Sequence, residues 1–183
     1  MKLNKALFCC WVFCAFAGRS QAAFDTNRIV VLVSLDGLAS FYLNDPKAEM
    51  PTLRALAREG AVARSMVPVI PTVTWPNHTT LATGVTPALH GVIGNTYFDR
   101  EKRGIVTLIQ DPVFDKEEIV KVPTIYDVAK AAGLTTAGIH WPATRNAKNL
   151  DWQVPATRSM ENQRAIHYAI VACGMREERG FYR

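Results

Sequence analysis

Continuous apolar runs along this chain are separated by short amphipathic stretches. Residues 28–35 read Arg-Ile-Val-Val-Leu-Val-Ser-Leu, a β-branched run of the length expected for a strand buried on both faces. Pro51 then opens a segment with apolar side chains at helical spacing, which Gly60 ends, and residues 61–69 follow as a second strand or extended segment. The order strand, helix, strand predicts a parallel α/β sheet with right-handed crossovers.

The second half of the chain repeats this order less regularly. Residues 105–109 are apolar and β-branched, a helix is predicted over 123–132 with Gly133 at its end, and residues 134–139 return as a strand. These segments fit one continuing α/β domain, because no linker or repeat interrupts them. The pattern is lost from about residue 162 to the end.

The first 22 residues have the three parts of a secretory signal peptide. Lys2 and Lys5 precede an apolar run over 6–17, and small residues follow at 20–22. The run is too short to span a bilayer, and no later segment approaches the roughly 18–20 apolar residues of a transmembrane helix. We therefore expect residues 1–22 to be removed, leaving a secreted or periplasmic chain without a transmembrane segment; a buried N-terminal helix is the alternative.

Removal of this leader changes the charge and the cysteine content. Three of the 21 basic residues leave with it, so the remaining 18 face 16 acidic residues, and this small surplus does not indicate binding to a nucleic-acid polymer. Cys9, Cys10 and Cys14 lie in the leader, and Cys173 alone remains. An internal disulfide framework is therefore excluded.

Two segments carry residues suited to phosphate chemistry. Asp36 follows the first predicted strand, where ligands bind in open α/β sheets; the alternative is a turn carboxylate that caps the following segment. Pro76 and Gly84 suit the start and end of a helix, so Thr74 would lie at or just before a helix N-terminus, which favours anions. Thr74 is then either an ordinary N-cap or a nucleophile that needs a base or a metal to activate it.

A third segment, residues 90–99, surrounds Asn95 with glycines that permit close backbone approach. The side-chain amide of Asn95 could donate to a developing phosphoryl oxygen. The alternative is an ordinary turn asparagine.

Taken together, these segments resemble the nucleotide pyrophosphatase/phosphodiesterases, or type I phosphodiesterases, of the alkaline phosphatase superfamily. The resemblance runs from about residue 29 to 152. It implies an α/β fold with the mostly parallel, helix-flanked sheet of alkaline phosphatase, of which this chain holds the N-terminal part. The matching segments are 33–37, 50–60, 71–84 with its core Thr-Trp-Pro-Asn-His, 90–95, and Trp141-Pro142.

The resemblance also implies roles for individual residues. Asp36 would ligate one of two zinc ions, Thr74 would bind the same zinc and form a covalent phosphothreonine, and Asn95 would hold the phosphoryl oxygens. The reaction implied is hydrolysis of a phosphodiester or pyrophosphate bond in a nucleotide or similar small ester, with phosphonate hydrolysis as an alternative. Trp75 and Tyr97 could stack on a planar leaving group or simply pack.

The histidines do not complete the zinc site that the resemblance implies. His78 is expected to make a structural hydrogen bond within its helix, His90 to be a turn residue, and His140 to approach the substrate side. The family's later ligands, an Asp-x-x-x-His pair, an Asp-His pair and a final histidine, have no match here, and His167 stands alone. Residues 23–183 are therefore expected to be the N-terminal portion of a catalytic domain, either from an active parent enzyme or as a non-catalytic fragment.

Overall fold

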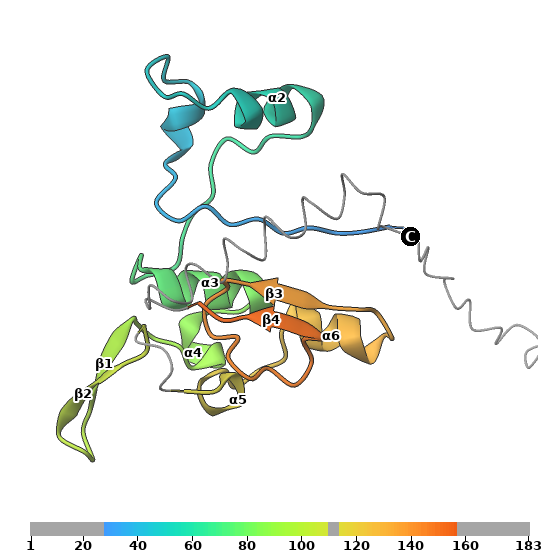
Figure 1. Cartoon of the computed structure of the whole chain (residues 1–183). Coiled ribbons are helices and arrows are strands. Elements are labelled where there is room, and N and C mark those ends of the chain that lie inside the picture. The colour runs from blue at the N-terminus through green and yellow to red at the C-terminus, as the bar shows by residue number, and fades with distance from the viewer. Residues whose placement is uncertain (1–27, 110–113, 157–183) are drawn as a thin grey trace, which may run out of the picture. The chain divides into compact units, whose positions relative to one another are not determined.

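The computed structural model describes residues 28–109 and 114–156 (Figure 1). The chain divides into two units, residues 1–33 and 34–183. The predicted signal peptide and the unpatterned segment 162–183 lie outside the described residues. The second unit contains, in chain order, η1 (Ser40–Leu43), α2 (Pro51–Glu59), α3 (Thr74–Thr83), α4 (Pro87–His90), β1 (Thr96–Asp99), β2 (Gly104–Thr107), α5 (Lys116–Ile119), α6 (Ile125–Ala131), β3 (Ala137–Ile139) and β4 (Trp152–Val154).

The strand predicted over residues 28–35 is absent, so this prediction is wrong. The segment has no regular secondary structure, and its apolar side chains are exposed, with Val30 91% accessible. The physical reason is that a strand forms only when its backbone groups pair with a neighbour. Neither strand pair of the described residues includes the backbone of this segment. The apolar pattern alone therefore could not create the strand.

The helix predicted to begin at Pro51 is confirmed as α2. Pro51 occupies its first position, Arg58 complements the dipole in its last turn, and Gly60 caps its end. Arg54 of α2 donates to the backbone carbonyls of Leu43 and Asp45, which ties the helix to η1. After α2, residues 61–69 contain no strand and are almost entirely exposed, which leaves the extended-segment alternative.

Helix α3 also matches its prediction. It begins at Thr74 and ends before Gly84, whose φ of 71° suits glycine at a helix C-cap. It packs against α4 and α6 (Figure 1). Its buried face includes Trp75 and Ala82.

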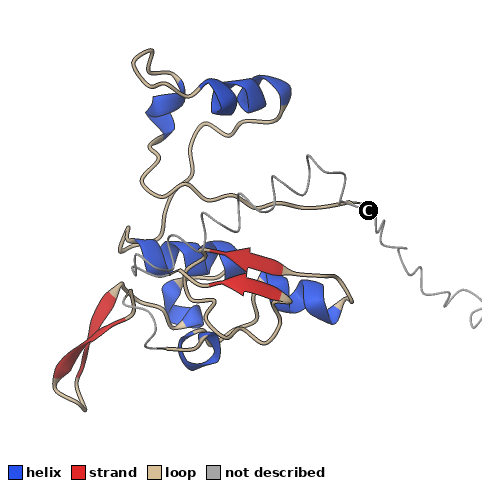
Figure 2. Ribbon diagram, in the orientation of Figure 1, coloured by secondary structure: helices blue, strands red, loops and turns tan. Residues whose placement is uncertain are grey.

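The strands form two small sheets (Figure 2). β3, within the predicted strand 134–139, pairs in parallel with β4, with Ala137 opposite Trp152 and Ile139 opposite Val154. Gly138 permits close packing here, because a Cβ would lie 2.9 Å from a Leu150 methyl carbon. The predicted strand 105–109 is β2, but it pairs with β1 as an antiparallel hairpin and does not join the parallel sheet.

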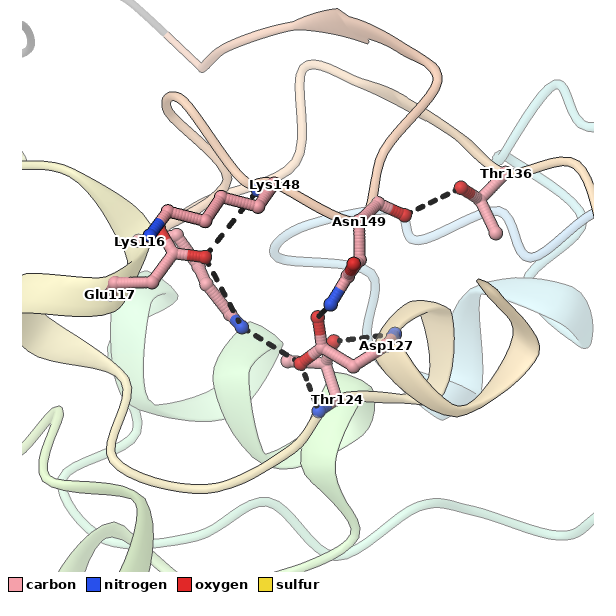
Figure 3. Close-up of polar contacts among 7 residues, drawn as sticks. All are labelled: Lys116, Glu117, Thr124, Asp127, Thr136, Lys148 and Asn149. Carbon is pink, nitrogen blue, oxygen red and sulfur yellow. Dashed lines mark hydrogen bonds and ion pairs between the residues drawn. The ribbon is translucent and has the colours of Figure 1, made fainter. Parts of the chain in front are cut away.

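The helix predicted over residues 123–132 is confirmed as α6, which begins at a capping box. The Thr124 hydroxyl accepts from the Asp127 backbone N–H, and Asp127 Oδ2 accepts from the Thr124 N–H at 2.7 Å. The same carboxylate pairs with Lys116 Nζ at 2.7 Å and accepts from Asn149 Nδ2 at 3.0 Å (Figure 3). This network joins α5, α6 and the loop before β4.

A small apolar core includes the first turn of α3. It consists of Trp75, Val92, Leu108, Val120 and Ala156, so five separate segments meet there. None of the helices among the described residues is long and apolar enough to cross a membrane.

Candidate active site

Thr74 and Asp36 meet although 38 residues separate them. Thr74 is the first residue of α3, and its hydroxyl donates to Asp36 Oδ2 at 2.8 Å. Asp36 is exposed in a turn with Gly37, whose φ of 72° favours glycine, and Thr74 is half-buried. The pairing leaves a hydroxyl polarised by a carboxylate at the helix end that favours anions.

The loop before Thr74 is held by Asn77, one turn into the same helix. Its Nδ2 donates to the carbonyls of Val73 at 2.8 Å and Pro71 at 3.1 Å, while its Oδ1 accepts from the Val69 N–H at 2.8 Å. The Ile70–Pro71 peptide bond is cis. Asn77 thereby fixes the backbone on which Thr74 is carried, a role that the sequence analysis missed.

His78 makes the structural hydrogen bond within its helix that was predicted. Its Nδ1 lies 2.9 Å from the Thr74 carbonyl oxygen. The other ring nitrogen, Nε2, lies 2.9 Å from Ser34 Oγ, and the ring meets Trp141 edge-on with 5.3 Å between centroids. The second bond links α3 to the segment that carries Asp36.

Asn95 reaches the N-terminus of α3. Its side-chain Oδ1 accepts from the Trp75 backbone N–H at 2.9 Å. The N-cap residue Val73 has no side-chain acceptor, so Asn95 caps the helix from a distant segment. Because the carbonyl end is occupied, the amide NH₂ points its donors elsewhere and makes no hydrogen bond within the described residues. The predicted donation from this amide to a phosphoryl oxygen stays a prediction, and the helix cap was not predicted.

His90 is fully buried at the end of α4, so the prediction of a simple turn residue understates it. Its Nδ1 accepts from the Val92 N–H at 3.1 Å, and Nε2 lies 3.0 Å from Thr80 Oγ1. Burial lowers the pKa of His90, although a hydrogen bond with the Pro76 backbone acts in the opposite direction. The neutral His90 ring therefore connects α3 to the loop that leads to Asn95 through these two hydrogen bonds.

The other residues that the sequence proposed for the site differ in how far they are buried. Trp75 is 8% exposed within the core, and Tyr97 packs against the same cluster, which is the packing that was the alternative to stacking on a substrate. His140 is exposed, with a φ of 53°. His167 lies outside the described residues.

Oxygen ligands for a metal ion are present but few. Asp36 and Thr74 bring a carboxylate and a hydroxyl within 2.8 Å of each other, which suits two positions of a zinc or similar shell. Over residues 28–109 and 114–156, no three His, Cys, Asp or Glu side chains gather closely enough to hold a metal. The described residues thus supply part of a ligand set.

Comparison with known proteins decides the family. The family model for type I phosphodiesterase / nucleotide pyrophosphatase matches residues 30–171. The chain belongs to this family. The resemblance seen in the sequence is thereby confirmed.

Individual relatives of the phosphodiesterase family match over only part of their length. Human ectonucleotide pyrophosphatase/phosphodiesterase family member 1 is 33% identical over 123 residues, which cover 67% of this chain and 13% of the relative. Venom phosphodiesterase 2 of Crotalus adamanteus is 39% identical over 88 residues, covering 47% of this chain and 11% of the relative. The chain therefore spans a small fraction of these relatives.

Solved structures confirm the fold class. Murine ectonucleotide pyrophosphatase/phosphodiesterase 5 matches with a TM-score of 0.58 and 24% identity, over 68% of this chain and 34% of that one. An inactive threonine-to-alanine variant of the murine protein, in complex with AMP, matches with a TM-score of 0.59 and 24% identity, over 69% and 34%. The predicted α/β fold of the alkaline phosphatase type, represented here in part, is thus confirmed.

Proposed function

We propose that this chain carries the nucleophile-bearing part of an exported, zinc-dependent hydrolase of phosphodiester or pyrophosphate bonds. One observation carries the proposal: the Thr74 hydroxyl, at the start of α3, donates to Asp36 at 2.8 Å. A threonine hydroxyl is a weak nucleophile, and a neighbouring acceptor for its proton is what the reaction needs. An ordinary N-cap threonine would instead bond to the first turn of its own helix.

In the proposed reaction, Thr74 Oγ1 forms a bond to phosphorus while the bond from phosphorus to the leaving oxygen breaks. The hydroxyl proton passes to Asp36 Oδ2, which releases it to solvent and returns to a carboxylate, and the leaving oxygen takes up one proton from solvent. Water then hydrolyses the phosphothreonine and restores the Thr74 hydroxyl. A covalent intermediate of this kind divides one difficult displacement into two easier ones.

Two N–H donors are available for the phosphoryl oxygens. The Trp75 N–H is capped by Asn95, and Pro76 has no N–H, so the Thr74 N–H remains in the first turn of α3. The amide NH₂ of Asn95 is the second donor. Donors held in place before the reaction stabilise developing charge without reorganisation, and removal of one typically costs about 10²–10³ in turnover.

A metal ion would be held by Asp36 and Thr74, with further ligands from outside the described residues. Zinc in such a site supplies a Lewis acid that stabilises the alkoxide and neutralises phosphoryl charge. Two zinc ions are proposed for the complete site. The fit rests on the two oxygen donors, which face each other at 2.8 Å.

A nucleotide or similar small ester is the proposed substrate, and phosphonate hydrolysis is the alternative. The AMP complex of the murine structural neighbour supports a nucleotide. Of the two aromatic candidates, Tyr97 is the more accessible for stacking on a leaving group, since Trp75 lies in the core. Export, with residues 1–22 as signal peptide, is supported by relatives named as ecto-enzymes and venom enzymes.

The test combines zinc stoichiometry of the 183-residue chain with hydrolysis of bis-p-nitrophenyl phosphate and mass spectrometry of the Thr74 peptide. We expect bound zinc, turnover, and a phosphorylated Thr74 peptide after acid quench. Thr74→Ala should abolish the phosphopeptide and lower turnover by several orders of magnitude. Thr86→Ala is the matched control, because Thr86 begins α4 without a side-chain cap and should leave turnover unchanged. Near-normal turnover in Thr74→Ala would overturn the nucleophile assignment.

A non-catalytic fragment is the second candidate, favoured by the short ligand set of the described residues. In that case the chain binds phosphate-type anions weakly at the start of α3 but turns over no substrate. Phosphate titration by NMR, with shifts at Thr74 and Asn95, together with no zinc and no turnover, would favour this candidate over the first.

A further inference from the structure

We propose that His78 is a positioning residue that sets the spacing between Thr74 and Asp36. The inference rests on the proposed function, because the spacing matters for the attack of Thr74 on phosphorus. His78 itself touches neither substrate nor the proposed metal. It acts through the backbone of Thr74 on one side and through Ser34 on the other.

Hydrogen bonds and the backbone between residues 34 and 36 link Ser34, Asp36, Thr74 and His78 into a closed ring. His78 Nδ1 is 2.9 Å from the Thr74 carbonyl oxygen, and Nε2 is 2.9 Å from Ser34 Oγ. Ser34 precedes Asp36 by two residues, and Asp36 Oδ2 returns to the Thr74 hydroxyl at 2.8 Å. His78 is 8% exposed, so water does not compete for these bonds as it would at the surface.

Among the described residues, two hydrogen bonds join the segment 34–38 to α3. One is the bond between Ser34 and His78, and the other is the bond between Asp36 and Thr74 themselves. The hydrogen bond between Thr74 and Asp36 depends on the Thr74 hydroxyl proton, which is lost in the proposed reaction. This bond therefore cannot hold the two side chains at a fixed distance throughout the reaction. The bond from His78 to Ser34 is the contact that persists, because none of its atoms changes.

The geometry also fixes the protons on the ring. The Thr74 carbonyl can only accept, so His78 Nδ1 must carry a proton. In the neutral ring Nε2 is then an acceptor, and the Ser34 hydroxyl is its donor. Edge-on contact with Trp141 holds the plane of the ring. The opposite tautomer would break the bond to Thr74, so the ring nitrogens provide a direct spectroscopic readout.

The experiment uses the full chain, Ser34→Ala, and ¹⁵N-edited NMR of the histidine rings. In the wild type we expect the Nδ1–H tautomer at His78. Ser34→Ala should shift the backbone signals of Asp36 and Thr74, lower kcat with zinc and bis-p-nitrophenyl phosphate by about 10- to 100-fold, and change KM less than about twofold. The melting temperature should stay close to that of the wild type, and Ser34→Thr, which keeps the hydroxyl, should restore kcat.

Two further variants separate positioning from general destabilisation. His78→Asn retains a donor near the Nδ1 position but cannot reach Ser34, so it should lower kcat as much as Ser34→Ala, and the double variant should lose little more. Thr83→Ala is the control, since it removes a 2.7 Å bond to the Thr79 carbonyl within α3 that has no link to Ser34. It should leave kcat unchanged.

The outcomes for the two proposals are distinguishable. Wild-type kcat in Ser34→Ala would overturn the positioning role, and so would an equal loss in Thr83→Ala. If the wild-type chain shows no turnover at all, the proposed function fails, and NMR alone decides the positioning role. The Nε2–H tautomer at His78, or unshifted signals at Asp36 in Ser34→Ala, would then overturn it, and the expected tautomer with shifted signals would support it.

Discussion

Replacement of Asp127 by asparagine tests how much the ion pair at the start of α6 stabilises the fold. The side chains of Lys116 and Asp127 are 8% and 11% exposed, and their charged atoms lie 2.7 Å apart. Asparagine can still accept from the Thr124 N–H, so the helix cap survives. The negative charge is lost together with the acceptor for Asn149 Nδ2, and Glu117, 3.7 Å away, is then the charged partner that Lys116 keeps among the described residues.

The magnitude follows from the pKa of Asp127. Burial would raise it, but the bonds from Lys116, the Thr124 backbone and Asn149 outweigh burial and lower the pKa from 3.8 to about 2. At about 1.4 kcal/mol per pKa unit, and with allowance for screening by solvent, the carboxylate contributes about 2 kcal/mol to the free energy of unfolding. Because the pKa is lower in the folded chain, this contribution is complete above about pH 4 and is lost as the pH falls through about 2.

The assay is urea unfolding of wild type and Asp127→Asn, followed by circular dichroism at several pH values. We expect a difference of about 2 kcal/mol at pH 7 that shrinks as the pH approaches 2. Lys102→Met is the control, because Lys102 is 75% exposed and 3.9 Å from Asp99; it should change stability by less than about 0.5 kcal/mol.

A double-mutant cycle supplies the refutation. In a Lys116→Met background the ammonium is gone, so Asp127→Asn should cost less than in the wild type, by about 1–2 kcal/mol. An unchanged cost in that background, or a difference that persists undiminished at pH 2, would show that the ion pair is not the source of the stability.

Three further predictions concern the active-site loop and its supports. Asn77→Ala should lower the free energy of unfolding by about 1–3 kcal/mol and speed hydrogen exchange in residues 69–73, because the backbone groups that Asn77 bonds are left unpaired. Unchanged slow exchange in residues 69–73 would show that the Asn77 side chain does not hold this loop. Gly91→Ala should cost more than about 1 kcal/mol in urea unfolding, since φ is 86° and a Cβ would lie 2.9 Å from Lys121 Cγ; unchanged stability would refute this. Asn95→Asp keeps the helix-capping oxygen but replaces the free donor with a charge, so phosphate binding by NMR should weaken without loss of stability, whereas unchanged phosphate binding would argue against the donor role.

The helices were predictable because their signals are local. Pro51 and Gly60 bound α2, and Gly84 ends α3, through conformational preferences that act within one or two residues. Strands were less predictable, because pairing depends on a partner elsewhere in the chain. The run at 28–35 has strand propensity without a partner among the described residues, and residues 105–109 found an antiparallel neighbour in β1.

Some contacts of the candidate site were likewise predictable from the sequence, and others were not. The meeting of Asp36 with the start of α3 agrees with the family resemblance, which placed both residues at one zinc, although no strand ends at Asp36. The cap that Asn95 provides could not be predicted, because it joins segments 20 residues apart. One signal was present: Val73 is a poor N-cap, so the helix had to find its acceptor elsewhere.

The contacts of Asn77 also bear on where the chain tolerates added length. They span no more than eight residues, so the conformation of the loop before Thr74 is encoded in one continuous stretch. A residue inserted between 69 and 77 would disturb the hydrogen bonds that Asn77 makes to the backbone of this loop. The segment 61–68 is exposed and lies outside these bonds, so an insertion there should cost little free energy. Over evolutionary time, divergence in length should therefore accumulate before residue 69 and stop there.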